Sequence, residues 1–97
     1  MNVLKKEQIR NQRMINEYIK ELDLLPKGKI VPKSIKGNIY YYLYYREGKK
    51  VISKYVGKNE DSLKNVREQL ERRNQIEMMI KMLKEEQIKI KKLEGLL

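Results

Sequence analysis

Residues 38–58, NIYYYLYYREGKKVISKYVGK, decide the fold of this 97-residue chain. A β-favouring run is followed by a turn that contains glycine and then by a second β-favouring run, which is typical of a β-hairpin. Six of the chain's seven tyrosines lie in this stretch. The sequence therefore predicts a tyrosine-rich hairpin, with the other segments packed around it.

The turn of this hairpin leaves the pairing of its strands open. A two-residue loop at Glu47-Gly48 would pair Tyr44 with Val51, whereas a three-residue loop would pair Tyr45 with Val51. A shift of one residue turns the whole side-chain pattern over. We favour the three-residue loop because it collects a plausible core face: Ile39, Tyr41, Leu43, Tyr45, Val51 and Tyr55. The outward face would then hold Tyr40, Tyr42, Tyr44, Arg46, Lys50, Ile52 and Lys54.

Three further segments complete the expected fold. Residues 1–25 carry apolar side chains at the three-and-four spacing of a helix, and a proline at position 26 ends it. Residues 29–35 form a strand that Pro32 confines to a sheet edge. Residues 61–93 contain no glycine or proline and predict a long second helix. Asp61 or Ser62 is the favoured N-cap, and Asn59 also carries a suitable oxygen.

The expected architecture is a single α+β domain over residues 1–97, in the order α-β-β-β-α. Its three-stranded antiparallel sheet spans residues 29–58. Both helices are expected on one face of the sheet, which leaves the other face free for a partner.

The long second helix has two apolar faces. Leu63, Val66 and Leu70 define the first, and the second, rotated by about a third of a turn or more, consists of Ile76, Met79, Ile80, Leu83 and Ile90. The change falls at residues 71–74. Either the helix bends there, or it packs first on the sheet and then on the N-terminal helix or a second subunit. A coiled-coil homodimer through residues 76–90 is one expectation.

Positive charge is concentrated in the middle of the chain. The net charge is +10, and residues 26–58 carry nine Lys or Arg against Glu47 alone. Residues 1–25 and 59–97 each carry only one excess positive charge. Such a local field attracts polyanions, nucleic acid first and an acidic protein surface or anionic lipid next.

The composition argues against an enzyme. Without His or Cys, most metal-ligand sets and the common acid–base and nucleophilic pairs cannot be built. The glutamates between residues 68 and 86 alternate with cations at helical spacing, which is typical of solvated pairs. There is no phosphate-binding loop of Walker type. We expect no catalytic residues, no cofactor and no metal.

Membrane and export signals are not expected either. No apolar run approaches the roughly 20 residues needed to span a bilayer. The start of the chain, MNVLKKEQIR, lacks the apolar core of a signal peptide. We expect a cytoplasmic protein that makes no membrane contact.

Aromatic and cationic residues alternate on the predicted sheet. Tyrosine rings stack on unpaired bases, lysine and arginine displace counterions from phosphates, and a β-ribbon can enter a DNA major groove. Tyrosines also suit any half-buried strand, and lysines protect an exposed sheet from aggregation. We expect a non-enzymatic nucleic-acid-binding protein, with DNA favoured over RNA. The candidate binding residues are Lys33, Lys36, Tyr40, Tyr42, Tyr44, Arg46, Lys49, Lys50, Lys54 and Lys58.

The segment IKGNIYYYLYYREGKKVISKYVGK resembles small Lys/Tyr-rich bacterial and phage proteins that join a YYYLxYREGK hairpin to a C-terminal helix. It is also similar to the sheet near the N-terminus of some insertion-sequence transposases. The resemblance covers about a quarter of the chain and implies a phage or mobile-element setting with DNA contact. The element order also resembles double-stranded-RNA-binding domains, whose loop histidine and KKxAK-like helix start are missing here.

A protein-interaction factor is the alternative function. The small size, the lack of catalytic residues and the long two-faced helix would suit a protein that binds a nucleic-acid-handling complex. One example is a phage-encoded, anti-CRISPR-like inhibitor of a host defence nuclease.

Overall fold

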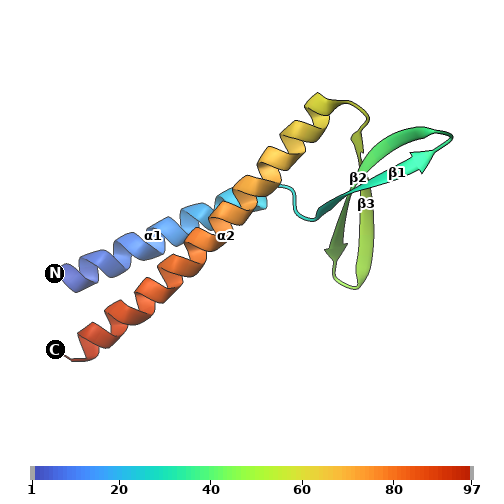
Figure 1. The fold of residues 1–97 in the computed structure, drawn as a ribbon. Helices are drawn as coiled ribbons and strands as arrows, with labels where there is room; N and C mark the ends of the chain where they lie inside the picture. Colours follow the sequence, from blue (N-terminus) through green and yellow to red (C-terminus); the bar gives the residue numbers. More distant parts are fainter. Residues whose placement is uncertain (1, 97) are drawn as a thin grey trace. The chain divides into compact units, whose positions relative to one another are not determined.

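The computed structural model describes residues 2–96 and contains two helices and three strands within them (Figure 1). The elements are α1 (Val3–Asp23), β1 (Lys29–Ile35), β2 (Asn38–Glu47), β3 (Lys50–Gly57) and α2 (Glu60–Gly95). The predicted α+β class and α-β-β-β-α order are confirmed.

The chain divides into two compact units, and α2 contributes to both. The helical unit contains α1 and the part of α2 from Asn74 onward, and the sheet unit is Leu25–Arg73. The boundary falls within residues 71–74, where the sequence shows the apolar stripe of α2 changing face. The change of stripe therefore coincides with a change of packing surface along one unbroken helix.

The sheet has the strand order β1-β2-β3, and both pairings are antiparallel. β1 is an edge strand, as the proline at position 32 predicts. Ile35 pairs with Asn38, so Lys36 and Gly37 form a two-residue turn. Both residues have positive φ angles, 50° and 81°, as a type I′ hairpin turn requires.

The second hairpin has a register that neither considered loop provides. Glu47 pairs with Lys50, so the loop is Gly48-Lys49, and the favoured three-residue loop is wrong. Gly48 has a φ of 63° at the first loop position, which is the geometry of a type II′ turn. This turn is favoured over the two loops considered above because its twist matches that of the flanking strands. In addition, glycine adopts positive φ without a steric penalty.

The changed register inverts the expected pattern of β3 but not that of β2. Leu43 is buried, whereas Val51 and Tyr55, expected in the core, are 62% and 53% exposed. They share the outward face of β2, and Lys50, Ile52 and Lys54 share the face of Leu43 instead. Ile39, also expected in the core, is exposed near the start of β2. The tyrosines at positions 41 and 45 are half-buried.

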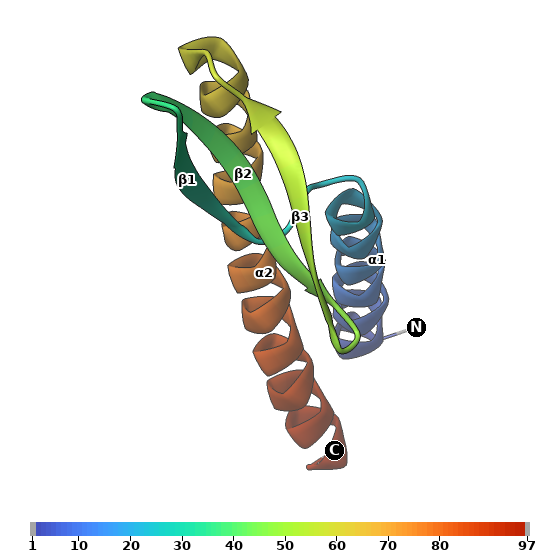
Figure 2. The same ribbon diagram turned by 90° about the vertical axis from the view of Figure 1, so that its right-hand side faces the viewer.

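The first turns of α2 lie on one side of the sheet (Figure 2). Leu63 in these turns and Leu43 in β2 are the buried hydrophobic residues of this unit, 2% and 5% exposed. The Asn59 side-chain oxygen caps α2 by accepting a hydrogen bond from the Ser62 N–H at 2.8 Å. The N-cap is therefore Asn59 and not Asp61 or Ser62. The opposite face of the sheet is left to solvent within this unit.

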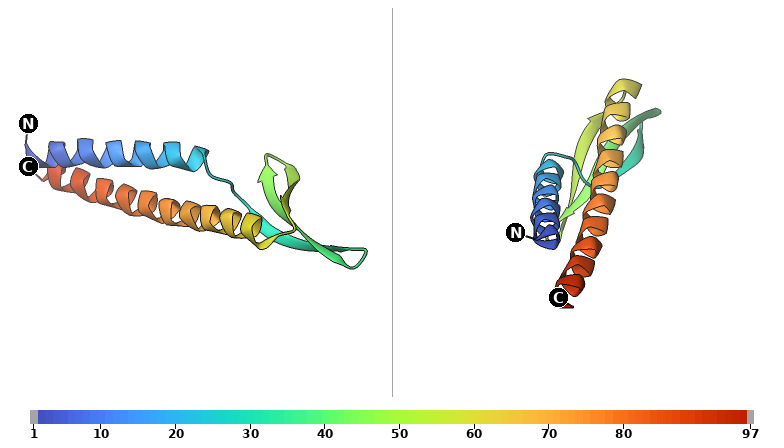
Figure 3. Two further views of the ribbon diagram at one scale, coloured as in Figure 1. Left: turned by 90° about the horizontal axis from the view of Figure 1, so that it is seen from above. Right: turned by 90° about the vertical axis from the view of Figure 1, so that its left-hand side faces the viewer.

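In the helical unit, α1 lies beside the second half of α2 (Figure 3). Its buried residues are Asn11 and Ile15 from α1 and Ile76, Ile80, Leu83 and Ile90 from α2. The Asn11 side-chain amide donates to the Leu83 carbonyl at 2.8 Å, and the Gln87 amide donates to Gln12 at the same distance. The second apolar face of α2 therefore packs on the N-terminal helix, one of the two predicted partners.

Candidate nucleic-acid interface on the sheet

Four tyrosines gather on the face of the sheet that lies opposite the buried Leu43. Tyr40, Tyr42 and Tyr44 alternate with Leu43 along β2, and Tyr55 joins them from β3 because it pairs with Tyr42. We call this set the tyrosine face. The Tyr42 and Tyr55 ring centroids are 5.5 Å apart, those of Tyr40 and Tyr55 are 6.3 Å apart, and both ring pairs are tilted. The rings of Tyr40, Tyr42 and Tyr55 form one continuous aromatic surface, and Tyr44 belongs to the same face of the sheet.

A β-bulge lies next to Tyr55, the residue whose ring contacts two other tyrosines. Tyr42 pairs with Tyr55 and Tyr41 with Gly57, so Val56 is an extra residue in β3. The bulge leaves Tyr55 in ring contact with the tyrosines at both 40 and 42. Sequence reasoning placed Tyr55 in the core and so missed it as a site residue; the preference for a type II′ turn was the signal that could have found it.

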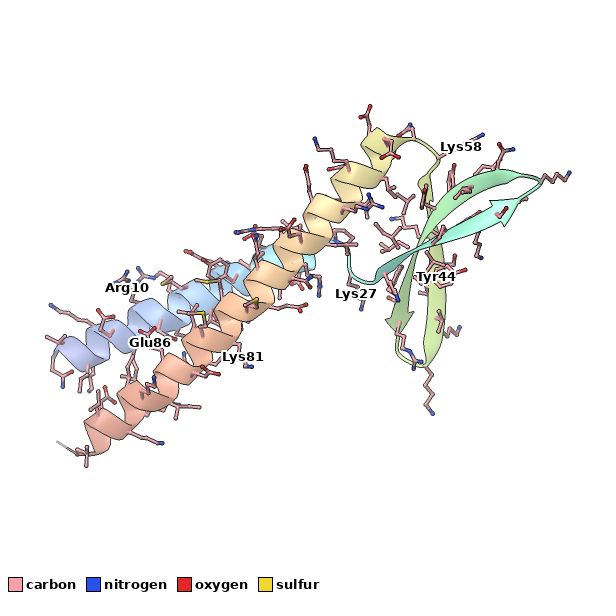
Figure 4. All side chains as sticks on the ribbon, viewed as in Figure 1. Arg10, Lys27, Tyr44, Lys58, Lys81 and Glu86 are labelled. Atoms are coloured by element: carbon pink, nitrogen blue, oxygen red, sulfur yellow. The ribbon has the colours of Figure 1, made fainter. Side chains whose placement is uncertain are left out.

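Two lysines lie over the tyrosine rings. The Lys33 Nζ, from β1, is 4.8 Å from the Tyr42 ring centroid and 5.1 Å from that of Tyr44. The Lys58 Nζ is 5.5 Å from the Tyr40 ring and donates to the Asn38 side-chain oxygen at 3.3 Å. Figure 4 labels Tyr44 on the sheet and Lys58 at its end. These cation–π contacts hold two ammonium groups against the aromatic surface.

Lys33 and Tyr44 also shift each other's ionisation. Their side-chain hydrogen bond raises the pKa of Lys33 above its ordinary value. The same bond chiefly lowers the pKa of Tyr44, and a hydrogen bond with Ser53 adds a smaller lowering. The Lys33 ammonium is therefore charged throughout the physiological range, and the Tyr44 hydroxyl is a better hydrogen-bond donor than an ordinary phenol.

Other predicted site residues are distributed around the sheet. Arg46 pairs with Val51 on the tyrosine face and is exposed. Lys36 and Lys49 lie in the two hairpin turns.

The placement of Lys50 and Lys54 on the outward face is wrong. They pair with Glu47 and Leu43, so by register they belong to the opposite face. Lys29 was not among the predicted binding residues, yet it pairs with Tyr44 and so belongs to the tyrosine face. The Lys36-Gly37 turn, once its length is recognised, fixes this pairing and is the sequence signal for it.

The positive charge of this region is not neutralised by ion pairs. No Lys or Arg between residues 26 and 58 has a carboxylate of another described residue within 4 Å. Lys27 lies over the ring of Tyr45, 5.8 Å from its centroid, on the other face of the sheet. The excess charge of the segment is therefore available to an outside polyanion.

The described residues offer little other chemistry. Within residues 2–96, no group of three or more Asp or Glu side chains is arranged to hold a metal ion. In the same range, neither helix combines the length and apolarity that crossing a membrane requires. What the tyrosine face can do is bind, through stacking, hydrogen bonding and charge.

Comparison with known proteins gives a family but no characterised relative. No curated protein and no solved structure matches the chain. One family model matches residues 4–67, which include nearly all of α1, the whole sheet and the first turns of α2. Because this match covers well over half of the chain, the protein belongs to the family described as "Domain of unknown function (DUF6788)".

Proposed function

We propose that this chain is a non-enzymatic nucleic-acid-binding protein that uses its tyrosine face. The observation that carries the proposal is the set of four tyrosine rings on an open sheet face with Lys33 and Lys58 held over them. The exposed ring of Tyr55 and the half-buried rings of the other three tyrosines provide stacking platforms for bases, and the ammonium groups attract the adjoining phosphates. The excess of eight positive charges in residues 26–58 strengthens that attraction.

Single-stranded DNA is the substrate class that this surface suits best. A tyrosine ring can stack only on a base whose face is free, and bases inside a duplex have no free face. The resemblance of the hairpin to mobile-element and phage proteins favours DNA and a cytoplasmic setting. The alternating aromatic and cationic residues read no particular sequence, so we expect weak sequence preference.

The expected energies are modest and measurable. Each stacked base contributes about 1–3 kcal/mol. If Lys29, Lys33, Arg46 and Lys58 each neutralise one phosphate, the logarithm of the binding constant should fall with that of the salt concentration with a slope of about −3. This combination predicts binding that is clear at low salt and weak at high salt.

Fluorescence anisotropy with labelled oligonucleotides tests the proposal. Titrations of oligothymidine, a DNA duplex and their RNA counterparts, from about 50 to about 300 mM salt, should show preferred binding to single strands and the steep salt dependence above. The matched charge variants are Lys33→Ala, on the tyrosine face, and Lys81→Ala, on an exposed position of the helical unit. Lys33→Ala should weaken binding about tenfold and reduce the salt slope, whereas Lys81→Ala should change neither much.

Two results would count against the proposal. One is absence of binding to all four nucleic acids at low salt. The other is equal loss of affinity in both lysine variants, because that would indicate attraction to net charge rather than to this face. A protein that binds no nucleic acid but captures an acidic protein through the same residues would point instead to the interaction-factor function.

A further inference from the structure

The helical unit has a groove on one flank that its own side chains do not fill. It measures about 270 Å³, and α1 and α2 both contribute to it. Its lining includes Asn11 and Met14 from α1 and Met79, Met82 and Leu83 from α2. We call it the methionine groove. Met82 is 60% exposed and Met79 36% exposed, so flexible apolar side chains meet solvent here.

This flank lies beside the stripe that joins the two helices, and Leu83 belongs to both. The inward positions of α2 recur at alternate spacings of three and four, and they include Ile76, Ile80, Leu83 and Ile90. These side chains are buried within the chain, so the isoleucine stripe is already occupied by α1. Association of this unit with another protein would therefore use a different surface. The methionine groove offers the exposed side chains of Met79 and Met82, and its lining also includes the charged residues Glu7, Arg10 and Glu86.

A buried polar side chain, that of Asn11, is part of the lining of the groove. It is 2% exposed, and its amide donates to the Leu83 carbonyl, but its Oδ1 has no hydrogen-bond partner. A buried acceptor without a donor is destabilising, and a chain that covers the groove can supply one. A lone asparagine in an apolar helical seam is also a known determinant of orientation and oligomeric state.

The geometry points to a second copy of this chain as the occupant, in a two-fold symmetric dimer of helical units. Met14 lies between Arg10, four residues earlier, and Glu17, three residues later, on the same flank of α1. A two-fold axis at Met14 sets Arg10 of one copy opposite Glu17 of the other, twice. Within each copy Arg10 also lies 3.9 Å from the Glu7 carboxylate, an exposed pair that contributes little by itself. Figure 4 shows Arg10 on α1 and Glu86 on the neighbouring stretch of α2.

Charge distribution favours self-association at this unit rather than at the sheet. Residues 1–24 and 74–97 carry ten Lys or Arg and eight Asp or Glu, so two such units repel weakly. Residues 25–73 carry thirteen against five, so two sheet units repel each other strongly. Self-association is therefore expected at the helical unit.

The area available is sufficient for a small dimer interface. α1 has 21 residues and is about 31 Å long, and a pair of helices is roughly 20 Å wide. One flank therefore offers about 600 Å², or about 1,200 Å² for two copies, which is the lower end of the range for stable protein interfaces. A reversible dimer with a micromolar dissociation constant is the expected result.

Sedimentation equilibrium of the full chain tests this inference. Between about 1 and about 500 µM protein, the mass should rise from that of one chain to that of two. The double variant Met79→Glu/Met82→Glu should raise the dissociation constant at least about 100-fold, because it places charges in the apolar contact. Met78→Glu is the matched control: it lies in the same helix, is 66% exposed and does not line the groove, so its dimer should persist.

A charge exchange tests the two-fold axis independently of the methionines. Arg10→Glu alone or Glu17→Arg alone should weaken the dimer about tenfold, and the two together should restore it. Both side chains are exposed, so neither change should unfold the helix, which circular dichroism would check. A monomer at every concentration, a dimer unaffected by the methionine substitutions, or a double charge variant no tighter than the single ones would overturn the inference.

Discussion

The two units of this protein use their large side chains in opposite ways. The helical unit buries a row of aliphatic residues between two helices, and Ile76 within it has no exposed surface. The sheet unit buries Leu43 and Leu63 but leaves four tyrosines on an open face. A small domain has little apolar surface to spare, and rings that stay partly in solvent contribute less to its stability than fully buried side chains do. The comparison shows that the large side chains of the helical unit mainly pack against each other, whereas those of the sheet unit remain partly accessible to solvent.

Replacing Ile76 with Ala should give the largest loss of stability. The side chain is fully buried, and removing it leaves a cavity, so we expect a loss of about 3–4 kcal/mol in the free energy of unfolding. Chemical denaturation followed by circular dichroism measures this change. Met78→Ala, in an exposed position of the same helix, should cost less than about 0.5 kcal/mol. Equal losses of unfolding free energy in the two variants would contradict the distinction between buried and exposed positions of this helix.

Gly28→Ala should be the most damaging substitution at a position with no side chain. Gly28 has a φ of 119°, and a Cβ there would meet the carbonyl oxygen of Tyr44 in β2. Both the backbone strain and the clash oppose any side chain, so we expect a loss of about 2–3 kcal/mol. Gly37→Ala provides the matched control, because its φ is also positive but a Cβ would lie in open space. It should lose only about 1 kcal/mol, the cost of the conformation alone.

Tyr42→Ala should reduce DNA binding more than stability, whereas Ile76→Ala should reduce stability more than DNA binding. Tyr42 is half-buried on an open face, so its loss should reduce stability by only about 1 kcal/mol. It contacts Tyr55 and carries Lys33 over its ring, so single-stranded DNA should bind about 10-fold more weakly. Ile76→Ala should leave the affinity nearly unchanged at temperatures where the protein is folded. A Tyr42→Ala protein that is unstable but binds DNA normally would show that Tyr42 serves the fold and not the binding of DNA.

The sequence predicted the order of the helices and strands better than the pairing of the strands. Period-two alternation in β2 separated Leu43 from Tyr40, Tyr42 and Tyr44, and the structure places them on opposite faces, although Ile39, expected in the core, is exposed. The shift of the apolar stripe at residues 71–74 predicted that the second helix either bends there or changes its packing surface, and the boundary between the two units falls at the same place. Both signals are repeated over several residues, so one ambiguous position does not change them.

The faces of β3 depended on a single turn. Loops at Glu47-Gly48, at Gly48-Lys49 or over all three residues are compatible with the composition, and they place Tyr55 on different faces. The choice is made by strand twist and by the positive φ of Gly48, which are properties of the folded hairpin. Burial of Asn11 was also not evident, since its partner is a backbone carbonyl 72 positions away in the sequence.

The smallest expected effect concerns the Lys33–Tyr44 pair, which links the charge of the sheet unit to its aromatic surface. The hydrogen bond lowers the pKa of Tyr44 below its ordinary value of 10.0 and raises that of Lys33 above 10.5. For Tyr44, a lowered folded-state pKa adds stability as pH rises through it. For Lys33, a raised folded-state pKa means that its contribution is lost as pH rises further through that value. The pair therefore stabilises the sheet most between the two shifted pKa values.

Spectrophotometric titration of tyrosine isolates this interaction. Tyr44 should ionise earlier than in a Lys33→Met variant, where its pKa should move back toward the ordinary value because the largest cause of the lowering is gone. A Tyr44→Phe variant assigns the signal, since the early step should disappear from the titration curve. The helical unit supplies the control: Lys81→Met, outside the sheet, should leave the curve unchanged. If Lys33→Met also leaves it unchanged, the ammonium group is not held at the Tyr44 hydroxyl, and the tyrosine face loses one of its two fixed cations.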